Sequence, residues 1–167
     1  MGTPQLVGAS FDKELAQAIG TLFGNDSLFN GLSIIWGPGL NLHRTPCCGR
    51  NVEYYSEDPV LSGFLAAAYA QGAYSKGLIA AGKHFAFNDQ ETNRNGVAPF
   101  MTEQKARELE LRSFQIAFEN GMLGTMTAFN RIGTTYVSAH EGLIDGILRG
   151  EWDFRGTCLL YTSPSPR

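Results

Sequence analysis

The hydrophobic positions of the chain follow a helical spacing first and a strand-like pattern next. Phe11, Leu15 and Ile19 recur at every fourth residue, which places them on one face of a helix. The run LSIIWGPG (residues 32–39) is short, apolar and closed by Gly-Pro-Gly, a combination typical of a buried strand. The beginning of the chain therefore predicts a helix followed by a buried strand.

A second helix and a second strand are predicted by a start signal and another apolar run. Asp58 precedes Pro59, as an N-cap residue precedes a proline at the first helical position. The helix should continue through LSGFLAAAYAQGAYSKG (residues 61–77). The apolar segment GLIAAGKHFAF (residues 77–87) is the next strand candidate.

The segment TEQKARELELRSFQIAFENG (residues 102–121) is predicted to be an amphipathic helix. Its inward stripe should be formed by Ala106, Leu109, Ser113 and Ala117, with Phe114 and Phe118 beside it. Glu103 and Arg107 are spaced for a surface ion pair, and so are Glu108 and Arg112.

The last third of the chain repeats the same order of elements. GMLGTMTAF (residues 121–129) is a third strand candidate. Ser138 and Glu141 have the spacing of a capping box, and Gly150 can end the helix that this box opens. The inward face of that helix should contain Leu143, Ile144, Ile147 and Leu148. DFRGTCLL (residues 153–160) then begins as a fourth strand should.

Strands that alternate with helices and are apolar throughout predict an α/β fold, with a parallel sheet covered by helices. Two architectures fit this order, a doubly wound open sheet and a (β/α) barrel. A complete barrel takes about 250 residues. The 167 residues of this chain hold about half of one.

Composition narrows the class of protein only slightly. The chain is 43% hydrophobic and 17% charged with a formal net charge of -3, which is ordinary for a globular protein and argues against a nucleic-acid-binding surface. No stretch is apolar for long enough to cross a membrane. No secretory signal follows Met1, so the location stays unknown, with the cytoplasm slightly favoured.

Common signatures of cofactor and metal sites do not match this sequence. GPGLN does not fit the dinucleotide-binding pattern, and neither a phosphate-binding loop nor a nucleophile elbow occurs. His140-Glu141 begins like a zinc motif, but Ile144 stands where the second histidine belongs. Cys47, Cys48 and Cys158 have neither metal-ligand nor redox spacing. We therefore expect no metal and no cofactor.

The candidate functional residues follow the predicted strands, where sites of parallel sheets form. Lys83 and His84 stand together at the end of the second strand. The residues alone leave two interpretations open, a binding site or a buried pair balanced by neighbouring carboxylates. Arg50 could likewise anchor its loop to Glu53 or Glu57. A lining rich in amides, charges and aromatic rings suits a neutral polyol such as a sugar.

Four segments make the sequence resemble glycoside hydrolase family 3, in its β-glucosidase branch. They are GPGLNLHRTPCCGRNVEYYSEDPVLSG, KHFAFNDQETNR, MTAFNRIGTT and LRGEWDFRG, in the order of the family, and the resemblance extends from about Phe11 to Gly156. It implies that the chain is part of a (β/α)8 TIM-type barrel. It also implies retaining hydrolysis of β-glucosides without metal or cofactor, and it leaves β-xylosidase activity open.

The resemblance also implies a role for each matching residue. Sugar-contacting positions are implied for Arg50, Lys83, His84, Met126 and Phe129. Many members carry tyrosine where Phe129 stands, so a phenol hydrogen bond is absent here. Glu91 and Arg94 resemble residues that brace the Lys-His loop.

The carboxyl groups that perform the hydrolysis are not among the matching residues. A retaining glycosidase needs a nucleophile and an acid/base group about 5 Å apart. The family places its nucleophilic aspartate at the end of the strand after LRGEWDFRG, whereas Asp153 lies before that strand and is not a candidate. We therefore expect this chain by itself to be inactive and its parent to supply a further C-terminal domain. A truncated, non-catalytic sugar-binding protein is the alternative.

The last ten residues, CLLYTSPSPR (residues 158–167), have an explanation outside protein chemistry. The codons tgt ctc tta tac aca tct ccg agc cca cga spell this string, which resembles the adapter of transposon-based sequencing libraries. We expect residues 1–157 to be an incomplete barrel domain and residues 158–167 to be a non-native tail. A Pro/Ser-rich linker after a short strand is the alternative.

Overall fold

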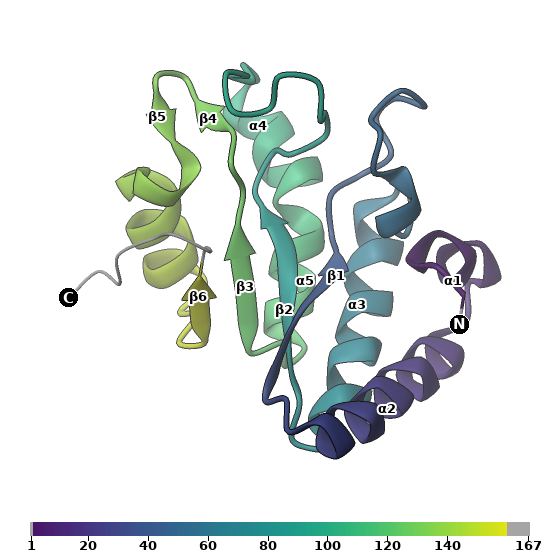
Figure 1. Cartoon of the computed structure of the whole chain (residues 1–167). Helices are drawn as coiled ribbons and strands as arrows, with labels where there is room; N and C mark the ends of the chain where they lie inside the picture. The colour runs from purple at the N-terminus through teal and green to yellow at the C-terminus, as the bar shows by residue number, and fades with distance from the viewer. Residues whose placement is uncertain (1, 160–167) are drawn as a thin grey trace.

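The computed structural model describes residues 2–159, and its central feature is a sheet of four parallel strands (Figure 1). The strands are β1 (Ile34–Gly39), β2 (Ile79–Phe85), β3 (Gly124–Thr127) and β6 (Thr157–Leu159), in the order β1-β2-β3-β6. In a doubly wound sheet this order would reverse at a central strand. Right-handed crossovers that always step in one direction instead place every helix on the same face. The sheet is therefore a segment of a barrel wall.

All four predicted strands form, with bounds that are shorter than the apolar runs. Two helices, α1 (Pro4–Ser10) and α2 (Lys13–Asn30), precede β1. A short 3-10 turn, η1 (Asn51–Glu53), and helix α3 (Pro59–Tyr74) lie between β1 and β2. The predicted cap of α3 is confirmed, because Asp58 Oδ1 accepts hydrogen bonds from the backbone N–H groups of Val60 at 2.7 Å and Leu61 at 3.2 Å. No helix among residues 2–159 is long and apolar enough to cross a membrane.

The predicted third helix is divided into three parts. They are α4 (Glu103–Lys105), a π-helical turn η2 (Ala106–Glu110) and α5 (Arg112–Glu119). The π turn adds an extra residue to the helix, and Glu110 at its end and the following Leu111 are both buried. The ion pair from Glu103 to Arg107 is confirmed at 2.8 Å.

The second predicted ion pair of this helix is wrong. Glu108 accepts a hydrogen bond from Gln104 at 3.1 Å, and Arg112 donates one to Gln115 at 3.0 Å. Glu108 lies within the π turn, whose wider winding changes the angle between Glu108 and Arg112 around the helix axis. Glu108 therefore bonds back to α4, and Arg112 bonds within α5.

The predicted capping box is also wrong. After a hairpin of β4 (Arg131–Ile132) and β5 (Thr135–Tyr136), Ser138 lies in a short 3-10 turn, η3 (Val137–Ala139). The following helix, η4 (Gly142–Glu151), is π-helical and begins too late for Ser138 to cap it. The Leu143 N–H instead donates to Nδ1 of His140 at 3.1 Å. The inward residues are confirmed, since Leu143 and Leu148 are buried and Ile144 and Ile147 pack against the core.

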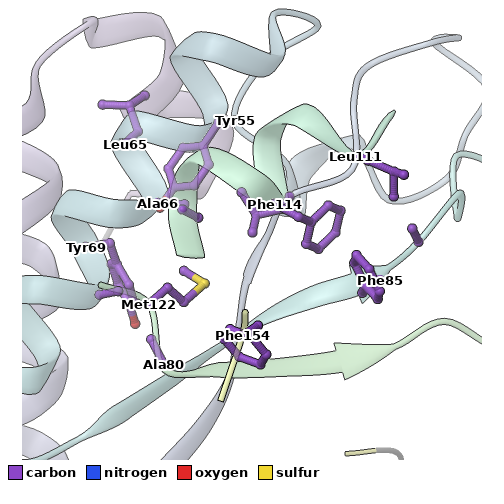
Figure 2. Close-up of a cluster of buried hydrophobic side chains, with 14 of the residues drawn as sticks. Tyr55, Leu65, Ala66, Tyr69, Ala80, Phe85, Leu111, Phe114, Met122 and Phe154 are labelled. Carbon is purple, nitrogen blue, oxygen red and sulfur yellow. The ribbon is translucent and has the colours of Figure 1, made fainter. Parts of the chain in front are cut away.

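The core between the sheet and its helices holds β2 in place (Figure 2). Phe85, at the end of β2, meets Phe114 edge-on with ring centroids 5.2 Å apart and Trp152 with centroids 6.0 Å apart. Helices α2 and α3 approach so closely that a Cβ on Gly20 would lie 2.0 Å from the Tyr69 carbonyl oxygen. The end of β2 is therefore a rigid support for Lys83 and His84.

Candidate functional site

The loops after β1 and β2 meet at the carboxyl edge of the sheet, at the top of Figure 1. Gly39 lies opposite Lys83 in the ladder between the two strands. Farther out, the Glu91 N–H donates to the Cys48 carbonyl oxygen at 3.2 Å and ties the two loops together. Residues that are distant in the sequence are thus collected at one edge, as parallel strands require.

Glu53 is the centre of this site, although the sequence suggested it only as an anchor for Arg50. Its carboxylate accepts two hydrogen bonds from Arg50, both at 2.9 Å, and lies 2.8 Å from Nζ of Lys83. Burial opposes ionisation, but the bonds from Arg50 and Lys83 outweigh it and lower the pKa of Glu53 to about 2. The alternative that paired Arg50 with Glu53 is therefore confirmed, and its bond to Lys83 is new.

Glu91 connects the same arginine to the next loop. Arg50 Nη1 donates to Glu91 at 3.3 Å, Arg94 pairs with Glu91 at 2.9 Å, and Asn88 donates to Glu91 at 3.1 Å. The Arg94 guanidinium also lies 4.9 Å from the ring centroid of Phe129. A cation over an aromatic face is attracted by its ring quadrupole. The predicted residues Arg50, Glu91, Arg94 and Phe129 thus form one connected group.

His84 is buried, with 2% of its surface exposed, and is held by Asn41, which sequence reasoning missed. The His84 backbone N–H donates to Asn41 Oδ1 at 2.8 Å, and Asn41 Nδ2 donates back to the His84 carbonyl oxygen at 3.1 Å. These two bonds assign the amide orientation of Asn41. Nδ1 of the His84 ring lies 3.3 Å from Asn41 Oδ1. Because that oxygen can only accept, Nδ1 must carry the ring proton to form a hydrogen bond with it.

The charge state of His84 follows from the same surroundings. Burial, followed by the positive charges of Arg50 and Lys83, lowers the pKa of His84 to about 3. The imidazole is therefore neutral near pH 7. With its proton on Nδ1, Nε2 is left as a hydrogen-bond acceptor.

Met126, like His84, is almost completely buried. It lies in β3 opposite Lys83 in the ladder and is only 2% exposed. Next to the site, Glu53 and Lys83 also line a cavity of about 340 Å³ whose walls include Trp36 and Tyr55. The site thus borders a space with an aromatic wall and two charged groups.

No cluster of three His, Cys, Asp or Glu side chains that could hold a metal occurs within residues 2–159.

Asp153 lies before β6, at the opposite edge of the sheet, where it is 73% exposed and paired with Arg155. Cys158 and Leu159 of the expected non-native tail pair with β3 as part of β6. The rest of that tail, residues 160–167, lies outside the described residues, and its origin stays a prediction.

Comparison with known proteins agrees with this geometry. The family described as "Glycosyl hydrolase family 3 N terminal domain" matches residues 3–160. The chain is 38% identical over 154 residues to probable beta-glucosidase J of Aspergillus fumigatus, and 41% identical over 151 residues to probable beta-glucosidase I of Aspergillus niger. These alignments include 92% and 90% of this chain.

Two solved structures share the fold closely. Beta-glucosidase 3B from Thermotoga neapolitana, in complex with alpha-D-glucose, superposes with a TM-score of 0.93 at 38% identity over 95% of this chain. DesR, a beta-glucosidase from Streptomyces venezuelae in complex with D-glucose, superposes with a TM-score of 0.94 at 32% identity over 99%. The chain belongs to glycoside hydrolase family 3 and forms part of its N-terminal barrel domain.

The chain spans only a small part of each relative. It covers 18% of the length of both Aspergillus proteins, 22% of the Thermotoga chain and 21% of the Streptomyces chain. The family and the fold are thus shown for this segment.

Proposed function

We propose that this chain forms the monosaccharide-binding floor of a retaining β-glucosidase, whose whole length releases β-D-glucose from non-reducing ends. The observation that carries the proposal is the bridge from Glu53 to Arg50 and Lys83. The bridge holds both cations in place while donor hydrogens on each stay available. Charged donors bind hydroxyl groups more strongly than neutral donors do.

His84 complements these donors. Its Nε2 accepts a hydrogen bond, and a sugar hydroxyl both donates and accepts. In the proposed site, Arg50 and Lys83 donate hydrogen bonds to neighbouring hydroxyl groups of the sugar, and Nε2 of His84 accepts one. Phe129, held by Arg94, supplies an apolar ring at the side of the same group of residues.

The chain by itself should bind sugar without hydrolysing a glycoside. Double displacement needs one ionised and one protonated carboxyl about 5 Å apart on either side of the bond. Glu53 and Glu91, the carboxylates in contact with Arg50, are both bound to cations. A carboxylate with a pKa of about 2 is also a poor proton donor at neutral pH. We propose that the catalytic pair comes from the rest of the parent protein.

Titration of the purified 167-residue chain with D-glucose, followed by NMR signals of the His84 ring and the Arg50 side chain, tests the proposal. Saturable shifts are expected, and Lys83→Gln should abolish them. Lys105→Gln is the matched control, because Lys105 is exposed on α4. Glucose that leaves both signals unmoved would contradict the proposed sugar site.

Two further measurements separate the alternatives. Incubation with an aryl β-glucoside should release no aglycone, and measurable turnover would contradict the assignment of catalysis to the rest of the parent. Titration with D-xylose tests the β-xylosidase alternative, since the two sugars differ by one hydroxymethyl group. Xylose that binds more tightly than glucose would favour that alternative.

A further inference from the structure

Three ionisable side chains from three segments meet at a place that the proposed sugar contacts do not use. Arg44 follows β1, Asp89 follows β2, and Glu110 lies on η2. Arg44 Nε is 3.0 Å from Glu110 Oε1, and the Glu110 side chain is only 2% exposed. The Asp89 carboxyl interacts with the Glu110 carboxyl and with the backbone of Leu42.

The two carboxyl groups lack the donors that a pair of carboxylates would need. Asp89 Oδ1 and Glu110 Oε1 are both buried without a hydrogen-bond partner of good geometry among residues 2–159. Burying an acceptor without a donor is costly. A single proton between Asp89 and Glu110 would supply the missing donor. It would also leave the cluster neutral, because Arg44 balances only one negative charge.

The electrostatic surroundings agree with a retained proton. Burial, and then the neighbouring Glu110 carboxyl, raise the pKa of Asp89 to about 8, against the opposing effects of Arg44 and the Leu42 backbone. Cys48, on the loop after β1, also faces Asp89, and burial raises the pKa of its thiol. Glu110 and Arg44 thus act on the pKa of Asp89, and Asp89 in turn acts on that of Cys48.

We propose that Asp89 and Glu110 share one proton, and that this bridge, anchored by Arg44, positions the two loops of the site. The loop of Arg44 also carries Asn41, which holds His84. The segment of Asp89 continues to Glu91. Loss of the proton leaves a net negative charge buried between the loops and displaces them. The bridge is a property of the unliganded chain and does not depend on sugar binding.

Carboxyl ¹³C NMR of the chain between about pH 3 and about pH 9.5 tests the bridge directly. Asp89 is expected to titrate near pH 8, whereas an ordinary aspartate titrates near pH 4. The His84 ring signals should shift with the same midpoint, because the loops move together. Titration of Asp89 near pH 4 would overturn the shared proton. His84 signals that stay constant through the Asp89 midpoint would overturn the positioning role.

Three variants separate the bridge from general stability. Asp89→Asn keeps a donor toward Glu110 and should remove the shift of the His84 signals near pH 8. Glu110→Gln removes the neighbouring charge and should move the Asp89 midpoint toward 4. Glu108→Gln, an exposed neighbour on the same helix, should change neither. A failure of glucose binding would leave these results intact, so the two proposals can fail separately.

Discussion

Replacing Glu53 by glutamine should destabilise the chain through the loss of its bonds to Arg50 and Lys83. A fall in pKa from 4.5 to about 2 corresponds to about 3 kcal/mol of extra stability for the ionised form. The Glu53 side chain is 34% exposed, so solvent screening reduces this to about 1–2 kcal/mol. That loss should lower the Tm by about 3–8 °C.

The pH dependence of this loss identifies its cause. Because the pKa of Glu53 is lowered by folding, its contribution is complete above pH 4.5 and is lost as the pH falls toward about 2. Urea unfolding at pH 7 and at about pH 3 should show that the difference between wild type and Glu53→Gln shrinks by about half at the lower pH. An equal difference at both values would refute the argument.

The matched control for this experiment is Glu57→Gln. Glu57 is the other carboxylate that the sequence offered as an anchor for Arg50, and it is exposed. A surface substitution of this kind should change stability by less than about 0.5 kcal/mol. A loss as large as that of Glu53→Gln would show that negative charge in the loop, and not the bridge to Lys83, is what matters.

Three other substitutions test the remaining contacts. Asn41→Ala removes the bonds at 2.8 and 3.1 Å that hold His84, so urea unfolding should show a loss of about 2–3 kcal/mol and glucose binding should weaken. Phe129→Leu removes the aromatic ring that lies 4.9 Å from the Arg94 guanidinium and should lower the free energy of unfolding by about 0.5–1 kcal/mol. Phe129→Tyr keeps the ring and should not lower it. Equal losses of stability in the two variants would exclude the cation–π contribution. Gly20→Ala should destabilise the chain by about 3 kcal/mol in thermal unfolding, because its Cβ would lie 2.0 Å from the Tyr69 carbonyl oxygen. Gly146→Ala is the control and should be neutral, because its Cβ would lie 4.0 Å from the nearest atom, the Glu141 carbonyl oxygen.

The helices and strands were largely predictable because their signals are local. Apolar runs identified all four strands, and Asp58 with Pro59 identified the start of α3. Local rules failed where a helix departs from its regular period. Glu110 is buried although it is charged, at a position four residues after Ala106 in the π turn, and a second π-helical segment begins after the predicted capping box.

The partners of the site residues could be predicted only in part. Arg50 and Glu53 are three residues apart, so their pairing was one of two visible choices. The contact of Lys83 with Glu53 spans thirty positions, and that of His84 with Asn41 spans 43. Nothing in the local pattern distinguishes Asn41 from other loop amides. These contacts depend on how closely neighbouring strands bring their loops.

The sequence alone determined the alternation of strands and helices, the family through its motifs, and the residues that gather after the strands. Tertiary structure decided between a doubly wound sheet and a barrel wall, since strand order is a property of the assembled sheet. It also decided the charge states of the site. Burial lowers the pKa of His84 to about 3 and raises that of Asp89 to about 8, whereas the bonds from Arg50 and Lys83 lower that of Glu53 to about 2, against the effect of burial.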